Sequence, residues 1–377
     1  MGMFSFLLLP FAVPIAIYLF FILRRFCVTV GLAVAGWRKK LLLWVIAAAL
    51  ALAGMMLSWM GAIFLLHLVV FAGIVQLVNF ILKKSARGRY ESGFALWRRV
   101  YGLFLVPLVL SLAVMVGGYI NLHTVRETAY TLHTDKQIRT EGYRVALIAD
   151  VHFGVSLDAE ELAEKCAEIS AKKPDLVILC GDIVDNSTTR EGMYAVFCEL
   201  GKIESTYGVF YVHGNHDRPM RIVASAFTEA ELVAAIEQNG ITVLQDEVVQ
   251  ITEDLVLVGR EDRSAARGEK GRASIAELLS AVELSDFVLT LDHQPNQYAE
   301  NGAAGTDLLL SGHTHGGQIF PLDILQEIVP FNDAVYGLYD IDDDSKAIVT
   351  SGFAGWAFPI KTAAPAEYVI IDILPKK

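Results

Sequence analysis

Clusters of aspartate, histidine and asparagine recur between residues 150 and 315, each directly after an apolar run. A single D-x-H or H-x-H is more often a surface loop than a set of ligands. Five clusters that all follow apolar runs are hard to explain as solvated loops, so they favour one shared site at the ends of strands. The clusters are DVH (150–152), GDIVD (181–185), GNHD (214–217), DH (292–293) and GHTH (312–315).

The residue types in these clusters indicate metal binding. Carboxylates and imidazoles without a thiolate suit Mn, Fe or Zn better than Ca. In a D-x-H on an extended strand end, side chains two residues apart point the same way and can hold one ion. Two ions about 3.5–4 Å apart need a bridging carboxylate, and Asp182, central in chain order and preceded by Gly181, is the natural bridge. His313 and His315 either share one ion or are split between two by the turn.

The charge of such a centre suits a phosphate. Two divalent ions, two aspartates, neutral ligands and a bridging hydroxide leave about +1, which attracts an anion and lowers the pKa of bound water. The predicted cofactors are therefore two divalent metal ions (Mn, Fe or Zn), with Mn favoured. The predicted ligands are Asp150, His152, Asp182, Asn215, His293, His313 and His315.

Apolar runs alternate with helical patterns around these clusters. The run 143–150 suits a buried strand, and Leu162, Cys166 and Ile169 then repeat at helical spacing. Strands alternating with helices predict an α/β fold, in which helices cover a sheet and ligands bind at the carboxyl ends of strands. Further predicted strands are 175–182, 207–217, 255–262, 286–293, 306–315, 347–356 and 367–374.

The series DVH, GDIVD, GNHD, a lone histidine and GHTH, in this order, resembles the calcineurin-like metallophosphoesterase superfamily over residues 143–374. With several apolar N-terminal segments and the ending GHTHGGQ, the chain is similar to bacterial membrane-anchored phosphoesterases and to transmembrane proteins with a metallophosphoesterase domain. The resemblance implies a four-layer αββα fold, in which two sheets pack face to face with helices outside. It also implies hydrolysis of a phosphodiester, pyrophosphate or phosphomonoester.

The resemblance further implies a role for each residue. His216 would face the substrate and stabilise the transition state or protonate the leaving oxygen, and Asp185 would orient His216. Related proteins often have an arginine where this chain has Lys361, so either a structural role or a weaker substrate contact is open there. His213, inside a strand, is interpreted as a packing residue or a residue that supports the ligands, and not as a ligand itself. The first ion would bind Asp150, His152, Asp182 and His315, and the second would bind Asp182, Asn215, His293 and His313.

The first 123 residues differ from the rest in charge and hydropathy. They contain eleven lysines and arginines and one acidic residue, Glu91, whereas the remainder has 20 basic and 41 acidic residues. Long uncharged runs predict about four transmembrane helices. The first run lacks a basic leading region and an obvious cleavage site, which favours an anchor over a signal peptide. The predicted regions are spans near 3–23, 41–59, 61–82 and 100–120 within a membrane region 1–123, a linker 124–142 and a metallophosphoesterase domain 143–377.

Basic residues gather in two short loops, 24–40 and 83–99. Such loops stay in the cytoplasm, which would leave the N-terminus and everything after residue 120 outside. We therefore expect a multi-pass protein of a bacterial cell membrane with an exoplasmic catalytic domain.

Other functions find less support in the sequence. Nucleic-acid binding is not expected, because an acidic domain without a basic stripe repels phosphate backbones. Cys166, Cys180 and Cys198 lack C-x-x-C spacing and are odd in number, which predicts buried free thiols. The sequence indicates no oligomeric state.

The substrate is predicted only as a phosphate ester, and a lipid or envelope polymer is one option because the domain is anchored beside a bilayer. The alternative function is a non-catalytic membrane sensor or transporter whose outer domain binds metal. That alternative needs polar groups within the spans, where His67 stands out.

Overall fold

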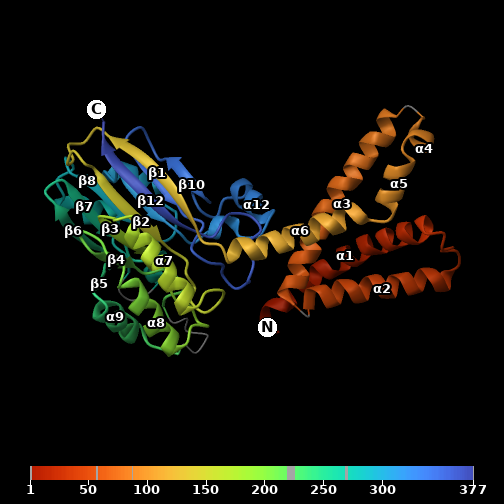
Figure 1. Cartoon of the computed structure of the whole chain (residues 1–377), viewed down its shortest axis with the longest axis horizontal. Coiled ribbons are helices and arrows are strands. Elements are labelled where there is room, and N and C mark those ends of the chain that lie inside the picture. Colours follow the sequence, from red (N-terminus) through yellow and green to blue (C-terminus); the bar gives the residue numbers. More distant parts are fainter. Residues whose placement is uncertain (1, 57, 87, 219–225, 268–270, 377) are drawn as a thin grey trace. The chain divides into compact units, whose positions relative to one another are not determined.

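The computed structural model describes residues 2–376 apart from residues 57, 87, 219–225 and 268–270. The described chain forms two compact units, Met1–Gly117 and Gly118–Lys377. In Figure 1 the first is coloured red to orange and the second yellow to blue.

The first unit is built from helices. Four helices of the described chain are long and apolar enough to cross a membrane, over Pro10–Thr29, Trp37–Met56, Trp59–Ser85 and Leu105–Leu122. Ser58 starts the third of them by accepting a hydrogen bond from the backbone N–H of Met60 at 3.1 Å. The helices are α1 (Gly2–Thr29), α2 (Trp37–Met56), α3 (Trp59–Ser85), α4 (Tyr90–Gly93), α5 (Ala95–Gly102) and α6 (Leu105–Leu122), whose last residues belong to the second unit.

The second unit contains two six-stranded mixed sheets. The first sheet consists of β1 (Arg126–Thr134), β2 (Tyr143–Ile148), β3 (Leu176–Cys180), β4 (Val209–Val212), β5 (Ile241–Val243) and β12 (Glu367–Pro375). The second consists of β6 (Glu247–Thr252), β7 (Leu255–Gly259), β8 (Phe287–Leu291), β9 (Leu308–Ser311), β10 (Gly337–Asp340) and β11 (Lys346–Val349). Their strand orders are β1-β12-β2-β3-β4-β5 and β10-β11-β9-β8-β7-β6.

The central strands are buried on both faces, which explains their unbroken apolar runs. Every residue of β3, β8 and β9 is buried. Between the sheets, Leu147 and Ile178 belong to the same core cluster as Leu289 and Leu310. Helices cover the outer faces, and they are α7 (Ala159–Ala171), α8 (Arg190–Leu200), α9 (Glu229–Gln238), α10 (Ile275–Leu278) and α11 (Tyr298–Ala304). A further helix, α12 (Leu322–Ile328), has no buried residue.

The helices α7, α8 and α9 lie on the outer face of the first sheet (Figure 1) and contribute Leu162, Phe197 and Leu232 to its core. On the second sheet, Ile275 of α10 packs with Val256. Two mixed sheets flanked by helices confirm the predicted four-layer αββα class.

One predicted linker contains a strand. Within residues 124–142, β1 pairs in parallel with β12 from Arg126 opposite Glu367 to Thr134 opposite Pro375. As an edge strand, β1 has Leu132 as its one buried residue. Backbone pairing with β12 stabilises β1. Because most side chains of β1 are not buried, its sequence shows no apolar run that would predict a strand.

Candidate metal centre

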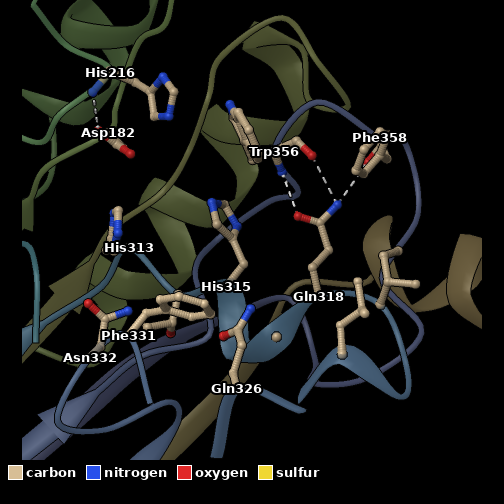
Figure 2. A pocket seen from close by; sticks show the side chains of 14 residues that line it. Asp182, His216, His313, His315, Gln318, Gln326, Phe331, Asn332, Trp356 and Phe358 are labelled. Carbon is tan, nitrogen blue, oxygen red and sulfur yellow. Dashed lines mark hydrogen bonds between the residues drawn. The ribbon is translucent and has the colours of Figure 1, made fainter. Parts of the chain in front are cut away.

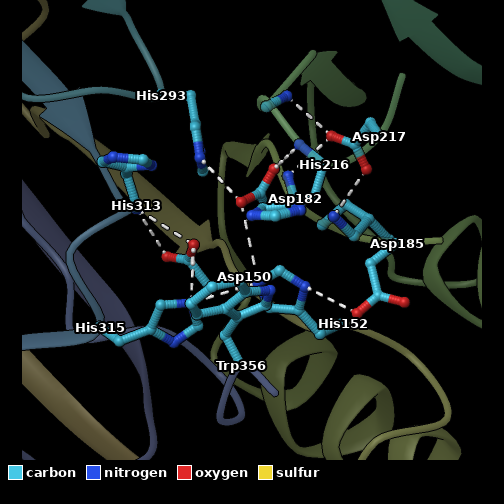
Figure 3. Close-up of polar contacts among 12 residues, drawn as sticks. Asp150, His152, Asp182, Asp185, His216, Asp217, His293, His313, His315 and Trp356 are labelled. Atoms are coloured by element: carbon cyan, nitrogen blue, oxygen red, sulfur yellow. Dashed lines mark hydrogen bonds and ion pairs between the residues drawn. The ribbon is translucent and has the colours of Figure 1, made fainter. Parts of the chain in front are cut away.

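The sequence clusters meet at the carboxyl ends of strands from both sheets. Asp150 follows β2, Asp182 follows β3 and Asn215 follows β4 in the first sheet, whereas His293 follows β8 and His313 follows β9 in the second. Parallel neighbours direct their carboxyl ends to one edge of each sheet. The side chains therefore converge although they are far apart in the sequence (Figure 3).

Six of the predicted ligands form two groups that could each hold a metal ion. In each group, one ligand atom of every residue lies within 4.8 Å of the others. His313 and His315 belong to different groups. This favours binding of the two histidines to different ions over binding to one shared ion, a choice that the sequence left open. The groups are Asp150, His152 and His315, and Asp182, His293 and His313.

Asp182 lies between the two groups. Its Oδ2 is 3.2 Å from Nε2 of His293 in its own group and 3.7 Å from Nε2 of His152 in the other. The other oxygen, Oδ1, accepts the backbone N–H of His216 at 2.7 Å. On the far side, Nε2 of His315 is 3.5 Å from Oδ1 of Asp150. One carboxylate oxygen thus faces histidines of both groups, an arrangement that fits a ligand shared by two ions.

Burial and mutual attraction compete at these side chains. Burial raises the pKa of Asp182 and lowers that of His293, but their attraction outweighs burial, so the first pKa lies well below and the second well above its usual value. Burial, together with the charge of Asp182, raises the pKa of Asp150 to about 6. A metal ion bound to Asp182 and His293 would replace the positive charge of protonated His293 beside Asp182, and the imidazole of His293 would lose its proton.

The residues present fit a pair of divalent ions. Oδ1 of Asn215 is a buried polar atom without a hydrogen-bond partner in the described chain, and buried polar atoms rarely stay unpaired. Asn215 follows Gly214, whose backbone lies against Asp182. Carboxylate, imidazole and amide donors without a thiolate suit Mn, Fe or Zn.

The backbone at the clusters differs from the extended geometry that we expected for D-x-H. Five of the predicted ligands have positive φ angles, a region that non-glycine residues seldom adopt. Asp150 and His152 therefore converge through tight loops, not through the alternation of a strand. The five residues are Asp150 (55°), His152 (40°), Asp182 (54°), His313 (71°) and His315 (51°).

Asp185 contacts a different histidine from the one predicted. Its Oδ2 lies 3.4 Å from Nδ1 of His152, and its Oδ1 accepts the backbone N–H and hydroxyl of Ser187 at 2.6 Å each. Burial raises the pKa of Asp185, but the contacts with His152 and Ser187 outweigh it and lower the pKa to about 2. The polar contact described for His216 runs from its backbone to Asp182, so orientation of His216 by Asp185 stays a prediction.

Comparisons with known proteins agree with this geometry. The family model described as calcineurin-like phosphoesterase matches residues 143–317. This part of the chain is a calcineurin-like metallophosphoesterase domain. A Helicobacter pylori protein described as an uncharacterized metallophosphoesterase is 30% identical over 254 residues, 67% of this chain and 64% of that protein.

Two further similarities extend to vertebrate proteins. A transmembrane protein with metallophosphoesterase domain from Danio rerio is 28% identical over 236 residues, 60% of this chain and 52% of that protein. The chain thus spans less than two thirds of the length of either relative. The solved structure of a dimetal phosphatase from Danio rerio aligns with a TM-score of 0.39 at 14% identity, covering 56% of this chain and 88% of that one.

Asp217 of the metallophosphoesterase domain supports the loop that carries Asp182, a role that was not predicted from the sequence. Its buried carboxylate accepts the backbone N–H groups of Asp182 at 2.7 Å, Ile183 at 2.9 Å, Val184 at 3.0 Å and Gly214 at 2.7 Å. Burial and the charge of Asp182 raise its pKa to about 6. The sequence signal was the acidic residue that ends GNHD.

The side chains of Lys361 and His213 are buried within the fold. Lys361 is fully buried, and its Nζ donates to the backbone carbonyls of Ser351 and, at 3.3 Å, Gly352. Lys361 therefore ties down the loop before β12, which favours the structural option over substrate contact. His213 is also buried, with its ring edge-on to Tyr211 at 5.1 Å.

A pocket of about 330 Å³ opens over the metallophosphoesterase centre (Figure 2). One side carries Asp182, His216, His313 and His315, and the other is largely apolar. The ring of His216 lies 5.1 Å from that of Trp356 across the pocket. The apolar side consists of Ile319, Leu322, Phe331, Trp356 and Phe358.

Proposed function

We propose that the chain is a membrane-anchored, dinuclear metal-dependent phosphoesterase. The observation that carries this proposal is the position of Asp182 between two groups of metal-ligating side chains at the floor of a pocket. Asp150, His152, Asp182 and His315 would hold one ion, and Asp182, Asn215, His293 and His313 the other. Manganese is the favoured ion.

The bound ions would hold the phosphate oxygens and supply an activated water as the nucleophile. The side chains of the protein would position the substrate and transfer a proton. His216 lines the pocket beside Asp182, where its imidazole can contact the leaving oxygen. Burial lowers the pKa of His216.

The substrate class that we propose is a phosphodiester, pyrophosphate or phosphomonoester, with a lipid or envelope compound as the narrower option. The four apolar helices of the first unit fit a membrane protein. We further propose that the protein lies in a bacterial cell membrane with its catalytic domain on the exoplasmic side, because the loops 24–40 and 83–99 are basic.

The alternative of a sensor or transporter gains no support from the described membrane helices. His67 is buried, and its Nδ1 is 2.8 Å from the carbonyl oxygen of Ile63 one turn earlier in α3. That local contact accounts for a polar group in an apolar helix.

Hydrolysis of bis-p-nitrophenyl phosphate by the full chain in detergent with Mn²⁺ tests the proposal. Asp182→Asn should lower kcat/KM by about a thousandfold or more, because both ions lose their shared carboxylate. Bound Mn should fall in the same variant. Asp372→Asn is the matched control, since Asp372 lies on β12 in an ion pair with Arg144. Equal activity of Asp182→Asn and wild type would refute the site.

A further inference from the structure

The helix α12 presents apolar side chains to the surroundings. No residue of α12 is buried, and the exposed fraction reaches 71% at Ile328 and 78% at Phe331. Short helices in water are held by packing an apolar face, which α12 does not do within the described chain. We call these residues the apolar ridge: Leu322, Ile324, Leu325, Ile328, Val329 and Phe331.

The apolar ridge adjoins the pocket. Leu322 and Phe331 line its apolar side together with Trp356 (Figure 2). The segment before the ridge is fastened to the loop 356–362: the side chain of Gln318 accepts the N–H of Trp356 at 2.9 Å, and Thr362 Oγ1 accepts the N–H of Phe320 at 3.0 Å. The ridge and that loop therefore form one surface at the mouth of the pocket.

The end of an apolar helix meets the same loop. The backbone carbonyl of Gly118, in α6, accepts the N–H of Lys361 at 3.1 Å. The side chain of Asn121 donates to the carbonyls of Lys361 at 3.0 Å and Ala364 at 2.9 Å. A β-carbon on Gly118 would lie 2.5 Å from Cγ2 of Thr362. The helix and the loop can therefore approach this closely only because residue 118 has no side chain.

This attachment limits how far the loop can be from a bilayer. The 18 residues of α6 give a helix of about 27 Å, close to the roughly 30 Å of a hydrocarbon core. If α6 spans, its last turn lies at the membrane surface, and the loop bonded to that turn lies there too. The apolar ridge is fastened to this loop.

The segment carries seven acidic residues and no cation that could bind anionic headgroups. Residues 319–345 include no lysine or arginine, and the ridge itself is interrupted only by Asp323, Gln326 and Glu327 among residues 322–328. Attraction to anionic headgroups therefore does not explain an exposed apolar surface here, whereas burial of apolar area in the acyl boundary does.

We propose that the apolar ridge inserts into the headgroup region of the lipid bilayer in which the chain is anchored. The pocket then opens beside the headgroups. Resting on the proposed function, the substrate phosphate would reach the metal centre from the membrane surface, with any apolar substituent against Leu322, Phe331 and Trp356.

Fluorescence quenching on the full chain in lipid nanodiscs, with one protein per disc, tests this placement. Cys27→Ser and Cys198→Ser remove the two accessible thiols, since Cys166 and Cys180 are buried. Ile328→Cys then carries an environment-sensitive nitrobenzoxadiazole label. The matched control is the same label at Tyr194→Cys, an exposed position on α8.

Phosphatidylcholine with a nitroxide near the headgroup end of the acyl chain should quench the label at 328 several-fold more than the label at 194. The difference should persist at high salt, because no cation of the segment takes part. Equal quenching at both positions overturns the proposal. A label that is shielded from water but not quenched by lipid also overturns it, and disulfide cross-linking between two copies would then identify a second chain as the occupant.

The proposed function is measured separately in the same sample. Ile328 does not line the pocket, so the labelled variant should hydrolyse a water-soluble diester at the wild-type rate. If neither the wild type nor the variant hydrolyses the diester, the proposed phosphoesterase function is contradicted. The quenching result alone decides whether the apolar ridge lies in the bilayer.

Discussion

At the scale of single residues, Nδ1 of three central histidines faces an oxygen atom of the protein. Nδ1 of His293 donates to the carbonyl of Cys180 at 2.8 Å, and Nδ1 of His315 lies 3.3 Å from the carbonyl of Ala354. Nδ1 of His152 faces Asp185. Such partners fix the ring and direct Nε2 to a metal ion.

Asp185→Asn separates two roles for this carboxylate. If Asp185 orients His152, the variant should bind Mn²⁺ about 10- to 100-fold more weakly and regain activity at saturating metal. Titration of activity and of bound Mn against free metal measures both quantities. Unchanged metal affinity with a lower kcat would instead assign Asp185 to His216. Asp175→Asn, at a carboxylate paired with Arg139, is the control.

At the scale of elements, the loops after the strands determine the site. Gly214, after β4, packs directly against Asp182, and a β-carbon there would overlap that carboxylate. A β-carbon on Gly312, after β9, would lie 2.5 Å from Oδ2 of Asp150. The loops can therefore approach the carboxylates only because these positions lack side chains.

Gly214→Ala should displace the Asp182 loop and lower Mn binding and kcat/KM by at least about tenfold, the scale of a lost supporting contact. Metal analysis and diester hydrolysis measure the two effects. Gly192→Ala provides the comparison, since Gly192 lies in α8, where the nearest atom to a β-carbon is the Thr189 hydroxyl at 3.3 Å. Wild-type metal binding by Gly214→Ala would contradict the steric argument.

The loop before β12 depends on Lys361 and gives a pH prediction. Burial lowers the pKa of Lys361 to about 7, whereas an unfolded lysine titrates near 10.4. Between these values the unfolded chain binds more protons, so the free energy of unfolding should rise with pH across about 7 to 10.4.

Lys361→Met should flatten that rise, and it should cost about 1–3 kcal/mol because the carbonyls of Ser351 and Gly352 lose their donor. Melting temperatures of the full chain in detergent at several pH values show both effects. Lys202→Met, at an exposed lysine that follows the end of α8, should leave the profile unchanged. A profile for Lys361→Met parallel to wild type would argue against burial of the charge.

At the scale of the whole molecule, two units of opposite charge share one chain. The basic loops lie in the first unit, and all acidic residues except Glu91 lie in the second. The prediction of buried thiols holds for Cys166 and Cys180 but is wrong for Cys198, which is exposed. The orientation proposed from the charge asymmetry can therefore be tested with thiols already present, since Cys27 is half-buried.

A membrane-impermeant maleimide should label intact cells that express the chain, and Cys198→Ser should remove that label. Cys27→Ser should not remove it, because the loop 24–40 is predicted in the cytoplasm. Mass spectrometry of the labelled protein identifies the site. Labelling of Cys198 only after permeabilisation would place the catalytic domain in the cytoplasm.

Much of the fold could be predicted because each central strand is an unbroken apolar run and the helices repeat their apolar residues at helical spacing. The family could be predicted for a related reason: the order of five polar clusters is itself a property of the chain. The roles of the individual ligands stay predictions until metal binding is measured. The strand β1 escaped prediction because its ladder to β12 is a long-range contact without a local pattern.

Residue types and their order along the chain were enough to predict which side chains gather, since strands that run parallel place their polar ends at one edge. How these side chains face one another depends on the folded loops. Positive φ angles at Asp150 and Asp182, the separation of His313 from His315, and the contact of Asp185 with His152 arise from loops. Loop conformation depends on neighbours brought from distant strands, which residue types and spacing do not encode locally.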